Sequence, residues 1–252
     1  MILFQDRVVA IFLGSCLVRN CTLSPVIVAI DGPAGSGKST TARLVAERLG
    51  YHYLDTGAMY RAVAYALADS PIEDESVVRE RLEGLQLAFR HEPDGIRVLV
   101  NGEDVTDSIR TPEVGALSSR ISAYKAVREK LVAEQRRIAR EYLRQGGGVV
   151  VEGRDIGTVV FPDADVKIFM VADPAIRARR RQEQLEAAGK VLPYETILQE
   201  IVERDRQDSE RELSPLRRAE DAIDLDTTKR SIGEQVDFVI EKVKERKGRF
   251  SV

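Results

Sequence analysis

The stretch Val26-Ile-Val-Ala-Ile-Asp-Gly-Pro-Ala-Gly-Ser-Gly-Lys-Ser-Thr40 joins an apolar run to a glycine-rich loop that ends in Lys-Ser. Gly32, four further residues and then Gly37-Lys38-Ser39 have the spacing of a phosphate-binding loop. In such a loop, backbone N–H groups bind phosphates, the lysine reaches the β- and γ-phosphate oxygens, and the hydroxyl binds Mg²⁺. The sequence therefore predicts a nucleoside triphosphate, with Mg²⁺ held by Ser39. The residues expected to bind the triphosphate are Gly32, Pro33, Ala34, Gly35, Ser36, Gly37, Lys38, Ser39 and Thr40.

The residues on either side of this loop match the structural context that the motif requires. β-favouring or small residues precede the loop, and residues 39–49 follow with the pattern of an amphipathic helix that Gly50 ends. Such a helix directs its unpaired N–H groups and the positive end of its dipole at the bound phosphates. This context argues against a chance glycine-rich turn.

The composition is that of a globular chain with one core and room for an inserted subdomain. Of the 252 residues, 43% are hydrophobic and 31% are charged, and the net charge is −3. This balance argues against a general nucleic-acid-binding protein, although the arginines between Arg177 and Arg218 can form a local anion site. We expect a small phosphate ligand and neither a nucleic-acid nor a membrane partner.

Cysteine and histidine are too few to suggest a metal centre. Cys16 and Cys21 both precede the loop, and His52 and His91 are the only histidines. The rest of the chain thus has no cysteine for a disulfide, a metal site or a thiol nucleophile, and a histidine-based centre is not expected. We expect a monomer in the reducing cytoplasm.

Residues 1–25 form a segment of a different character. Residues 8–18 are apolar but too few to span a bilayer, and Leu13-Gly-Ser-Cys16 is similar to a lipoprotein processing box. Asp6 ahead of this run, and the nucleotide-binding sequence after it, argue against an export signal. Our hypothesis is an N-terminal extension that is non-native or disordered, with translation starting near Val26.

Strand and helix patterns alternate along the rest of the chain. This alternation predicts an α/β fold with a parallel, doubly wound sheet, into which a small antiparallel element is inserted near residues 85–100. The predicted strands are residues 51–55, 85–90, 96–100, 146–152, 166–171 and 222–226. The predicted helices are residues 56–68 with helical periodicity continuing to 85, residues 111–145, 174–189 and 194–212, and a C-terminal helix.

Charged residues follow two of the predicted strands at their carboxyl ends. Ligands bind at this edge of a parallel sheet. Arg61, soon after the strand 51–55, is a candidate for an acceptor phosphate, and Tyr60 for a base or sugar; the alternative is a surface arginine and a core tyrosine. In Glu152-Gly-Arg-Asp155, we assign Arg154 to phosphate, Asp155 to base or sugar, and Glu152 to Mg²⁺ through water. A salt bridge from Glu152 to an arginine is an equal alternative.

The helix 194–212 and the helix before it supply further arginines. Arg204, Asp208 and Arg211 are spaced i, i+4, i+7 and share one helix face, which is either a clamp for the acceptor or an exposed face stabilised by ion pairs. Arg177 is followed by arginines at 179–181, and at least one of these four is expected to cover the transferring phosphoryl group as part of a lid. Arg177 is our candidate for that role, and the sequence leaves open which of the four contacts the transferring group.

Together these motifs resemble the bacterial cytidylate kinase family from Val26 to the C-terminus. The resemblance implies a P-loop NTPase-type three-layer fold with a central parallel sheet, in one kinase domain of residues 26–252. It implies a nucleoside-monophosphate-binding insert at about 69–145, which contains the small antiparallel sheet, and a short lid at about 173–192. The motifs that carry it are residues 30–38, 54–61, 109–114, 152–162, 204–211 and 214–216.

The resemblance also implies an activity and residue roles. The reaction would be ATP-dependent phosphorylation of CMP, and of dCMP, in pyrimidine nucleotide metabolism. The family often carries Ser and Asp where this chain has Thr56 and Glu152, changes that keep the chemistry. Residues implied around the acceptor phosphate are Thr56, Tyr60, Arg61, Arg154 and Arg204; those implied for cytosine are Ser119, Arg128, Asp155 and Arg211, and for the sugar Asp208.

Phosphoryl transfer to a phosphate needs no general base. The second pKa of the acceptor phosphate is about 6, so its oxygen is already an anion at neutral pH. Catalysis then consists of alignment and charge neutralisation. The catalytic residues that we expect to supply the positive charge, beside Mg²⁺, are Lys38, Arg61, Arg154 and Arg177.

Two other functions fit the phosphate-binding loop alone. A kinase of the shikimate type phosphorylates an alcohol, but such a small substrate does not require the insertion at residues 85–145. A nucleotide-dependent switch protein should carry a guanine-reading Asn-Lys-x-Asp stretch, which this sequence lacks. The sequence leaves the preference among CMP, dCMP and UMP open.

Overall fold

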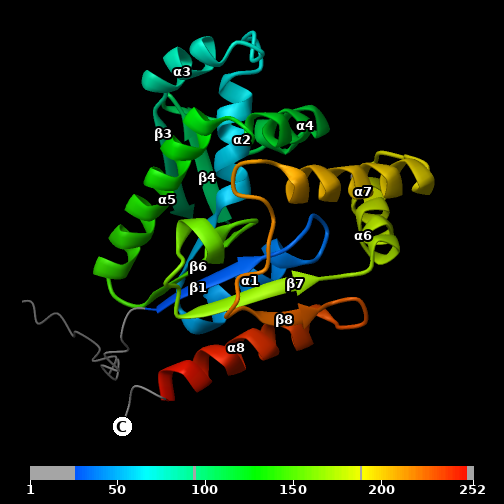
Figure 1. The fold of residues 1–252 in the computed structure, drawn as a ribbon. Coiled ribbons are helices and arrows are strands. Elements are labelled where there is room, and N and C mark those ends of the chain that lie inside the picture. The colour runs from blue at the N-terminus through cyan, green and yellow to red at the C-terminus, as the bar shows by residue number, and fades with distance from the viewer. Residues whose placement is uncertain (1–25, 93–94, 188, 249–252) are drawn as a thin grey trace, which may run out of the picture.

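The computed structural model describes residues 26–92, 95–187 and 189–248, so the hypothesis on residues 1–25 lies outside the described residues. Five parallel strands form the central sheet (Figure 1). They are β1 (Val26–Asp31), β2 (His52–Asp55), β6 (Gly148–Gly153), β7 (Val166–Val171) and β8 (Ile223–Asp226). Their order is β2-β6-β1-β7-β8, with the first strand in sequence at the centre. The predicted parallel sheet is confirmed.

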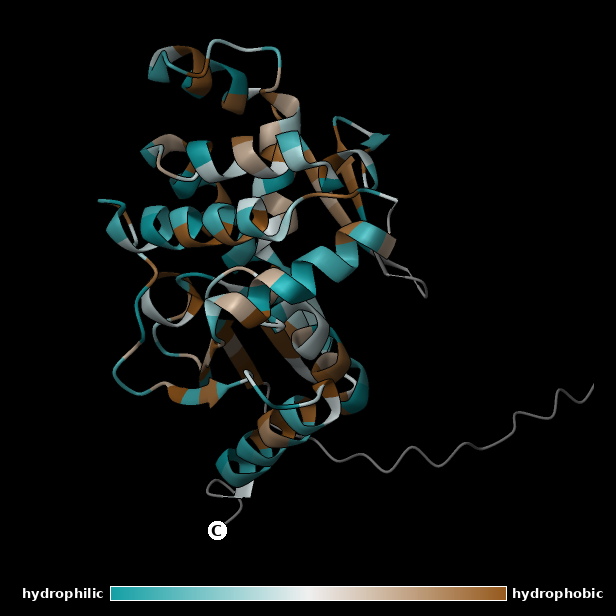
Figure 2. Cartoon of the chain, turned by 90° about the vertical axis from the view of Figure 1, so that its right-hand side faces the viewer, coloured by the Kyte–Doolittle hydropathy of each residue, from teal (hydrophilic) through white to brown (hydrophobic). Residues whose placement is uncertain are grey.

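Helices cover both faces of this sheet. The flanking helices are α1 (Lys38–Leu49), α2 (Thr56–Ala66), α5 (Lys125–Arg144) and α8 (Ile232–Gly248). Val28 and Ile30 of β1 pack in one core cluster with residues of α1 and α8, whereas Ala29 packs in a second cluster with residues of α2 and α5. This alternation follows from the two-residue period of a strand. The three-layer fold predicted from the sequence is thereby confirmed, and Figure 2 shows the hydrophobic residues gathered on the strands.

The strand register brings charged residues to one edge of the sheet. Asp55, at the end of β2, is paired with Glu152 on β6, and Asp31, at the end of β1, is paired with Gly153. Because all these strands run in the same direction, the residues that follow them lie at the same edge. The phosphate-binding loop and the segment Glu152–Asp155 are therefore neighbours, as predicted.

An insertion follows α2 and includes a small antiparallel sheet. Its elements are α3 (Glu75–Glu83), β3 (Leu87–Glu92), β4 (Gly95–Val100), β5 (Glu103–Asp104), the 3₁₀ turn η1 (Ser108–Arg110) and α4 (Pro112–Ile121). The sheet order is β3-β4-β5. In Figure 1 the insertion lies on the far side of the site from β8 and α8. The antiparallel pair expected near residues 85–100 is confirmed.

Two long helical patterns in this region are each interrupted by a turn in the structure, so their predicted continuity is wrong. The pattern from Thr56 to residue 85 is divided into α2 and α3, because Pro71 interrupts it and Asp74 caps a new helix by accepting a hydrogen bond from the Ser76 N–H at 2.9 Å. The pattern from 111 to 145 is divided into α4 and α5, with Tyr124 extended at the N-cap of α5. In both cases the hydrophobic periodicity continues through a turn.

The last part of the chain carries a helical hairpin beside the sheet. The π-helical turn η2 (Ile156–Val160) follows β6, and α6 (Pro174–Ala187) and α7 (Tyr194–Glu210) follow β7. The two helices have a small core of their own, formed by Ala178, Leu185, Ile197 and Ile201. Figure 1 shows α7 passing over the edge of the sheet that holds the phosphate-binding loop. Within the described ranges, no helix has the length and apolar character needed to cross a bilayer.

Candidate functional site

The phosphate-binding loop joins β1 to α1, and glycine determines its shape. Gly32 has a φ of +148°, and a Cβ at this position would lie 2.1 Å from the carbonyl oxygen of Met170 on β7. Gly37, directly before α1, has a φ of +94°. Because glycine has no Cβ, it allows both the close approach at Gly32 and the left-handed turn at Gly37. The loop consequently leads straight into the N-terminus of α1, whose first N–H groups have no partners within the helix.

Lys38 lies folded into this loop. Its buried Nζ donates hydrogen bonds to the carbonyl oxygen of Pro33 at 2.6 Å and to Oγ of Ser36 at 3.4 Å. Burial, together with the nearby charge of Arg154, lowers the pKa of Lys38. A polyphosphate bound in the loop would favour the charged ammonium, because an opposite charge within a few ångströms raises the pKa of a lysine. The loop and its lysine thus fit an anionic ligand.

Glu152 connects the end of β6 to the first turn of α1. Its Oε2 accepts a hydrogen bond from Oγ of Ser39 at 2.9 Å, and its Oε1 accepts one from the hydroxyl of Tyr53. Burial and the charge of Asp55 raise the pKa of Glu152. Among the residues that the structure describes, its side-chain partners are hydroxyls, so the alternative of an ion pair with arginine is wrong. Ser39 and Glu152 together present the oxygen ligands that Mg²⁺ prefers.

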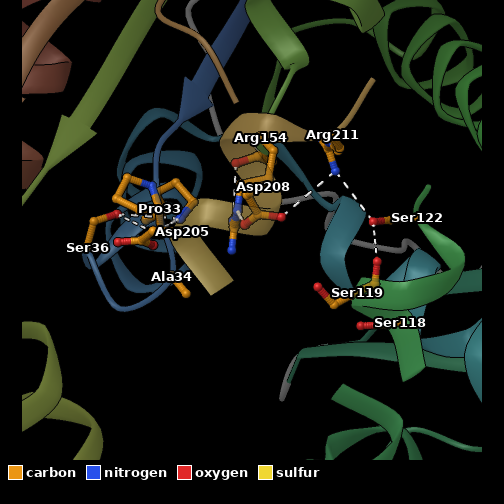
Figure 3. A network of polar contacts seen from close by, with 12 residues as sticks. Pro33, Ala34, Ser36, Ser118, Ser119, Ser122, Arg154, Asp205, Asp208 and Arg211 are labelled. Atoms are coloured by element: carbon orange, nitrogen blue, oxygen red, sulfur yellow. Dashed lines mark hydrogen bonds and ion pairs between the residues drawn. The ribbon is translucent and has the colours of Figure 1, made fainter. Parts of the chain in front are cut away.

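The acceptor side of the site begins with a buried ion pair between β6 and α7. Nε of Arg154 donates to Oδ2 of Asp208 at 2.7 Å, and Nη1 of Arg211 lies 3.9 Å from Oδ1 of the same carboxylate (Figure 3). Burial would raise the pKa of Asp208, but the charge and hydrogen bond of Arg154 keep that pKa below its usual value. The alternative of an exposed, ion-paired face is therefore wrong for Asp208 and Arg211. It describes Arg206 instead, which pairs with Glu203 and Glu210 in solvent.

A second buried ion pair lies next to the first. Arg128 on α5 forms an ion pair with Asp155 through Nη2, and its Nε donates a hydrogen bond to Oγ of Ser214 at 3.2 Å. Nε of Arg211 donates to the carbonyl oxygen of Ser214 at 2.6 Å. The Arg128 guanidinium also lies 5.9 Å from the ring centre of Tyr60. The structure thus brings together most of the residues that the resemblance implies for cytosine.

Two other predicted residues have structural contacts at the rim. Oγ1 of Thr56 donates to the carbonyl oxygen of Glu152 at 2.6 Å, which joins the start of α2 to the end of β6. Ser119 is half-buried on α4, and its carbonyl oxygen accepts a hydrogen bond from Ser122 Oγ at 2.7 Å. Figure 3 shows Ser118, Ser119 and Ser122 together across from Arg211. These serines face the site from the insertion.

Several guanidinium groups crowd the space between these pairs. Nε of Arg204 and Nη2 of Arg211 are buried and have no hydrogen-bond partner within the described part of the chain. Burial and the charge of Arg154 lower the pKa of Arg204 to about 10. Burial also lowers the pKa of Arg61, whose Nη1 donates to the carbonyl oxygen of Ile109 at 3.2 Å. Unpaired buried donors among like charges fit an anion such as the acceptor phosphate.

The arginines of α6 lie in four different environments. Arg177 is 3% exposed and is bonded to Asp205 and to the backbone of the phosphate-binding loop, so it does not lie on a free lid surface. Arg180 donates to the carbonyl oxygen of Thr227 at 2.6 Å. Arg179 and Arg181 are exposed, and the positive charge of Arg181 helps to lower the pKa of Arg61 and that of Arg204. Of these arginines, Arg181 is therefore exposed beside the acceptor cluster and Arg177 is not.

Sequence reasoning missed three residues of the site. Asp31 accepts hydrogen bonds from two consecutive backbone N–H groups, those of Ile156 at 2.8 Å and Gly157 at 2.7 Å. The Tyr53 hydroxyl donates a hydrogen bond to Glu152, and the Asp205 carboxylate accepts a hydrogen bond from Arg177. Asp31 stands at the carboxyl end of a strand, a position that could have identified it. Tyr53 and Asp205 carry no comparable signal in the sequence.

A family model and curated relatives show the family of this chain. The family model "Cytidylate kinase" matches residues 28–245. A cytidylate kinase of Salinibacter ruber is 53% identical over 89% of this chain and 99% of its own length, and one of Geobacter sulfurreducens is 50% identical over 88% and 94%. A solved structure, TT1252 from Thermus thermophilus, is 21% identical over 88% of this chain and 97% of its own, with a TM-score of 0.47.

Proposed function

The chain belongs to the cytidylate kinase family, and we propose that it transfers the γ-phosphoryl group of ATP to CMP, and also to dCMP. The observation that carries the proposal is the pair of unpartnered buried donors on Arg204 and Arg211, which lie beside Asp208 and the arginines paired around it. A triphosphate on the loop and a nucleoside monophosphate, with its phosphate at Arg204 and its base at Arg211, would meet at the carboxyl edge of the sheet. Two nucleotide sites that share one edge fit a nucleoside monophosphate kinase.

The donor half of the reaction uses the loop and its lysine. The N–H groups at the start of α1 would bind the triphosphate, and Lys38 would exchange its hydrogen bond to Pro33 for a phosphate oxygen. Ser39 would bind Mg²⁺ directly and Glu152 would bind it through water. When bound, Mg²⁺ neutralises charge on the phosphates. Tyr53 and Ser39 hold the two carboxylate oxygens of Glu152 in place.

The acceptor half uses positive charge and alignment. Arg61, Arg154 and Arg204 would surround the acceptor phosphate, whose oxygen is already an anion and needs no base. Asp208 holds the guanidinium of Arg154 in place through its Nε, which leaves most of that group's donors for phosphate. Arg128, Asp155 and Arg211, with Ser119, would recognise cytosine, and Asp208 would also contact the sugar. Arg181 is better placed than Arg177 to cover the transferring group.

The proposal is tested with one panel of acceptors. ATP and Mg²⁺ are supplied with CMP, dCMP, UMP, AMP, GMP and shikimate in turn, and ADP formation is followed by a coupled assay. We expect fastest turnover with a cytidine monophosphate. Fastest turnover with any other acceptor would contradict the proposal, and turnover of shikimate would favour the alcohol kinase.

A variant tests whether donor and acceptor sites are separate. Arg61→Ala is expected to bind ATP as the wild type does, because Arg61 lies on the acceptor side, and to lose about 100-fold or more in turnover of CMP. ATP binding is measured by calorimetry and turnover by the same coupled assay. Wild-type turnover of CMP by this variant would refute the role of Arg61.

We also propose that the enzyme acts as a monomer in the cytoplasm. The sites proposed above are assigned without a residue from a second subunit, and no cysteine lies between residues 26 and 252 to need an oxidising compartment. Light scattering on the eluting protein, with and without both nucleotides, tests the first point. A dimer in either state would contradict it.

A further inference from the structure

The guanidinium of Arg177 joins three parts of the fold. Its Nε donates to the carbonyl oxygen of Ala172, after β7, at 3.0 Å, and its Nη1 donates to that of Ala34, in the phosphate-binding loop, at 3.1 Å. On α7, Asp205 accepts from Nη1 at 3.0 Å and from Nη2 at 2.6 Å. Four of the five N–H donors of the arginine are thus used. Arg177 has little capacity left to bind a phosphate.

Asp205 belongs to the same helix as the acceptor residues. It follows Arg204 directly and precedes Asp208 by three residues, and Asp208 holds Arg154. Figure 3 shows Asp205 beside Pro33 and Ala34, with Asp208 and Arg154 next to it. One helix, α7, is therefore linked to the donor loop through Asp205 and Arg177, and to the acceptor arginine Arg154 through Asp208.

A second contact links the donor loop to the acceptor site from the other side. Asp31, directly before Gly32, accepts the N–H groups of Ile156 and Gly157, which fixes the turn that follows Arg154. Because Arg154 is bonded to Asp208 on α7, the contacts form a closed ring. The ring runs from the donor loop through the 154–157 turn to α7, and through Arg177 back to the loop.

Arg177 packs closely against the phosphate-binding loop, so a shift of the loop backbone would also shift the Arg177 side chain. A Cβ on Gly35 would lie 3.2 Å from Cβ of Arg177, so the loop backbone packs directly on this side chain. Triphosphate binds to N–H groups of this loop, and the carbonyl of Ala34 belongs to the peptide whose N–H is that of Gly35. The hairpin of α6 and α7 has a small hydrophobic core of its own.

We propose that Asp205 is a positioning residue that, through Arg177, couples the donor loop to the acceptor site. Binding of ATP then tightens binding of CMP, and binding of CMP tightens binding of ATP by the same factor, as linkage requires. The inference rests on the proposed function, since it takes CMP as the acceptor. It assigns to Arg177 the alignment of the two sites instead of contact with the transferring group.

Calorimetry on the whole chain tests this coupling. The Kd of CMP is measured with and without a saturating non-hydrolysable ATP analogue and Mg²⁺. In the wild type, the analogue is expected to lower this Kd at least about fivefold. In Asp205→Asn, which keeps the shape but loses the charge, the effect is expected to fall to less than about twofold, whereas each nucleotide alone binds within about threefold of wild type.

Glu203→Gln is the matched control. It removes one negative charge from the same helix two residues away, at an exposed ion pair with Arg206, and should keep the wild-type coupling. Arg177→Lys is the second variant, because lysine keeps the charge but cannot bond the carboxylate in bidentate fashion. It should lose coupling as Asp205→Asn does, and the double variant should lose no more than either alone.

The outcomes separate this inference from the proposed function. Full coupling in Asp205→Asn or in Arg177→Lys, no coupling in the wild type, or loss of CMP binding by Asp205→Asn even without the analogue would each overturn the inference. Wild-type protein that binds ATP but no cytidine monophosphate would refute the proposed function itself. If Asp205→Asn fails to fold, the comparison of Arg177→Lys with the wild type and with Glu203→Gln decides whether the coupling depends on this ion pair.

Discussion

Replacing Asp208 with alanine is expected to destabilise the protein strongly, because this buried carboxylate is the shared partner of two partly buried arginines. Its side chain is 8% exposed, and those of Arg154 and Arg211 are 19% and 9% exposed. Asp224→Ala is the natural comparison, since Asp224 also pairs with an arginine, Arg218, at 2.8 Å, close to the 2.7 Å of the Arg154–Asp208 contact. The side chains of this second pair are 42% and 59% exposed. The two ion pairs therefore differ in how buried they are, whereas their N–O distances are nearly equal.

The expected magnitudes follow from that difference. Removing one partner of a buried ion pair costs about 3–5 kcal/mol, because the remaining charge is left without a partner in a poorly solvated place. Water has some access to Arg154, so we expect a loss near the lower end, about 3 kcal/mol, for Asp208→Ala. The exposed pair should contribute roughly 0–1 kcal/mol. For a domain of this size, these values correspond to about 6–12 °C and at most about 4 °C in melting temperature.

Thermal unfolding followed by circular dichroism, with urea titration for the free energy of unfolding, measures both variants. Asp208→Ala should also keep ATP binding and lose use of CMP, since its arginines are no longer held in place. If Asp208→Ala were no less stable than Asp224→Ala, or if it turned over CMP normally, the assigned role of the buried carboxylate would be refuted.

Two further predictions concern the lid and the metal. Arg181→Ala should lower the kcat for CMP by about 100- to 1,000-fold with a smaller change in KM, whereas Arg179→Ala on the same helix should be close to wild type in steady-state assays; equal effects would contradict the placement of Arg181. Because burial raises the pKa of Glu152, a larger share of this carboxyl is protonated at pH 6 than at pH 8, and protons compete with Mg²⁺. The Mg²⁺ concentration that gives half-maximal activity should therefore rise as the pH falls, and this pH dependence should weaken in Glu152→Gln; a Mg²⁺ requirement that is independent of pH in the wild type would count against Glu152.

The sequence was sufficient to predict where the site lies. The apolar strands end in Asp31, Asp55 and Glu152, and a charged residue at the end of a buried strand needs polar partners that an apolar core does not supply. In a parallel sheet all such ends meet at one edge, so the sheet type and the positions of these residues place the site together. The i, i+4, i+7 spacing likewise predicted that Arg204, Asp208 and Arg211 lie together; Arg204 and Asp208 are in α7, whereas Arg211 is one residue beyond its end, with Nη1 still 3.9 Å from Asp208.

The sequence was not sufficient to tell which charged residue of a helix is buried. In residues 203–211, nearly every position is charged, and the local pattern gives Asp205 and Arg206 the same character. Asp205 reaches Arg177 and Arg206 remains in solvent because of where α6 packs, which is a tertiary effect. The same reason separates Arg177 from Arg181: they are four residues apart and share one face of α6, but which turn of this helix packs on the loop is decided by tertiary packing.

The central position of β1 has a consequence for how the chain is made. β1 is synthesised first, yet its two neighbours in the sheet are β6 and β7, which end at Gly153 and Val171. At a synthesis rate of roughly 5–20 residues per second, the 140 residues from Asp31 to Val171 take about 7–28 s to appear. Until β6 is complete at Gly153 this apolar strand has no native partner, and one of its edges stays open until β7 is complete, so the nascent chain is exposed to aggregation. A ribosome stalled before residue 148 would hold a polypeptide whose central strand cannot be paired.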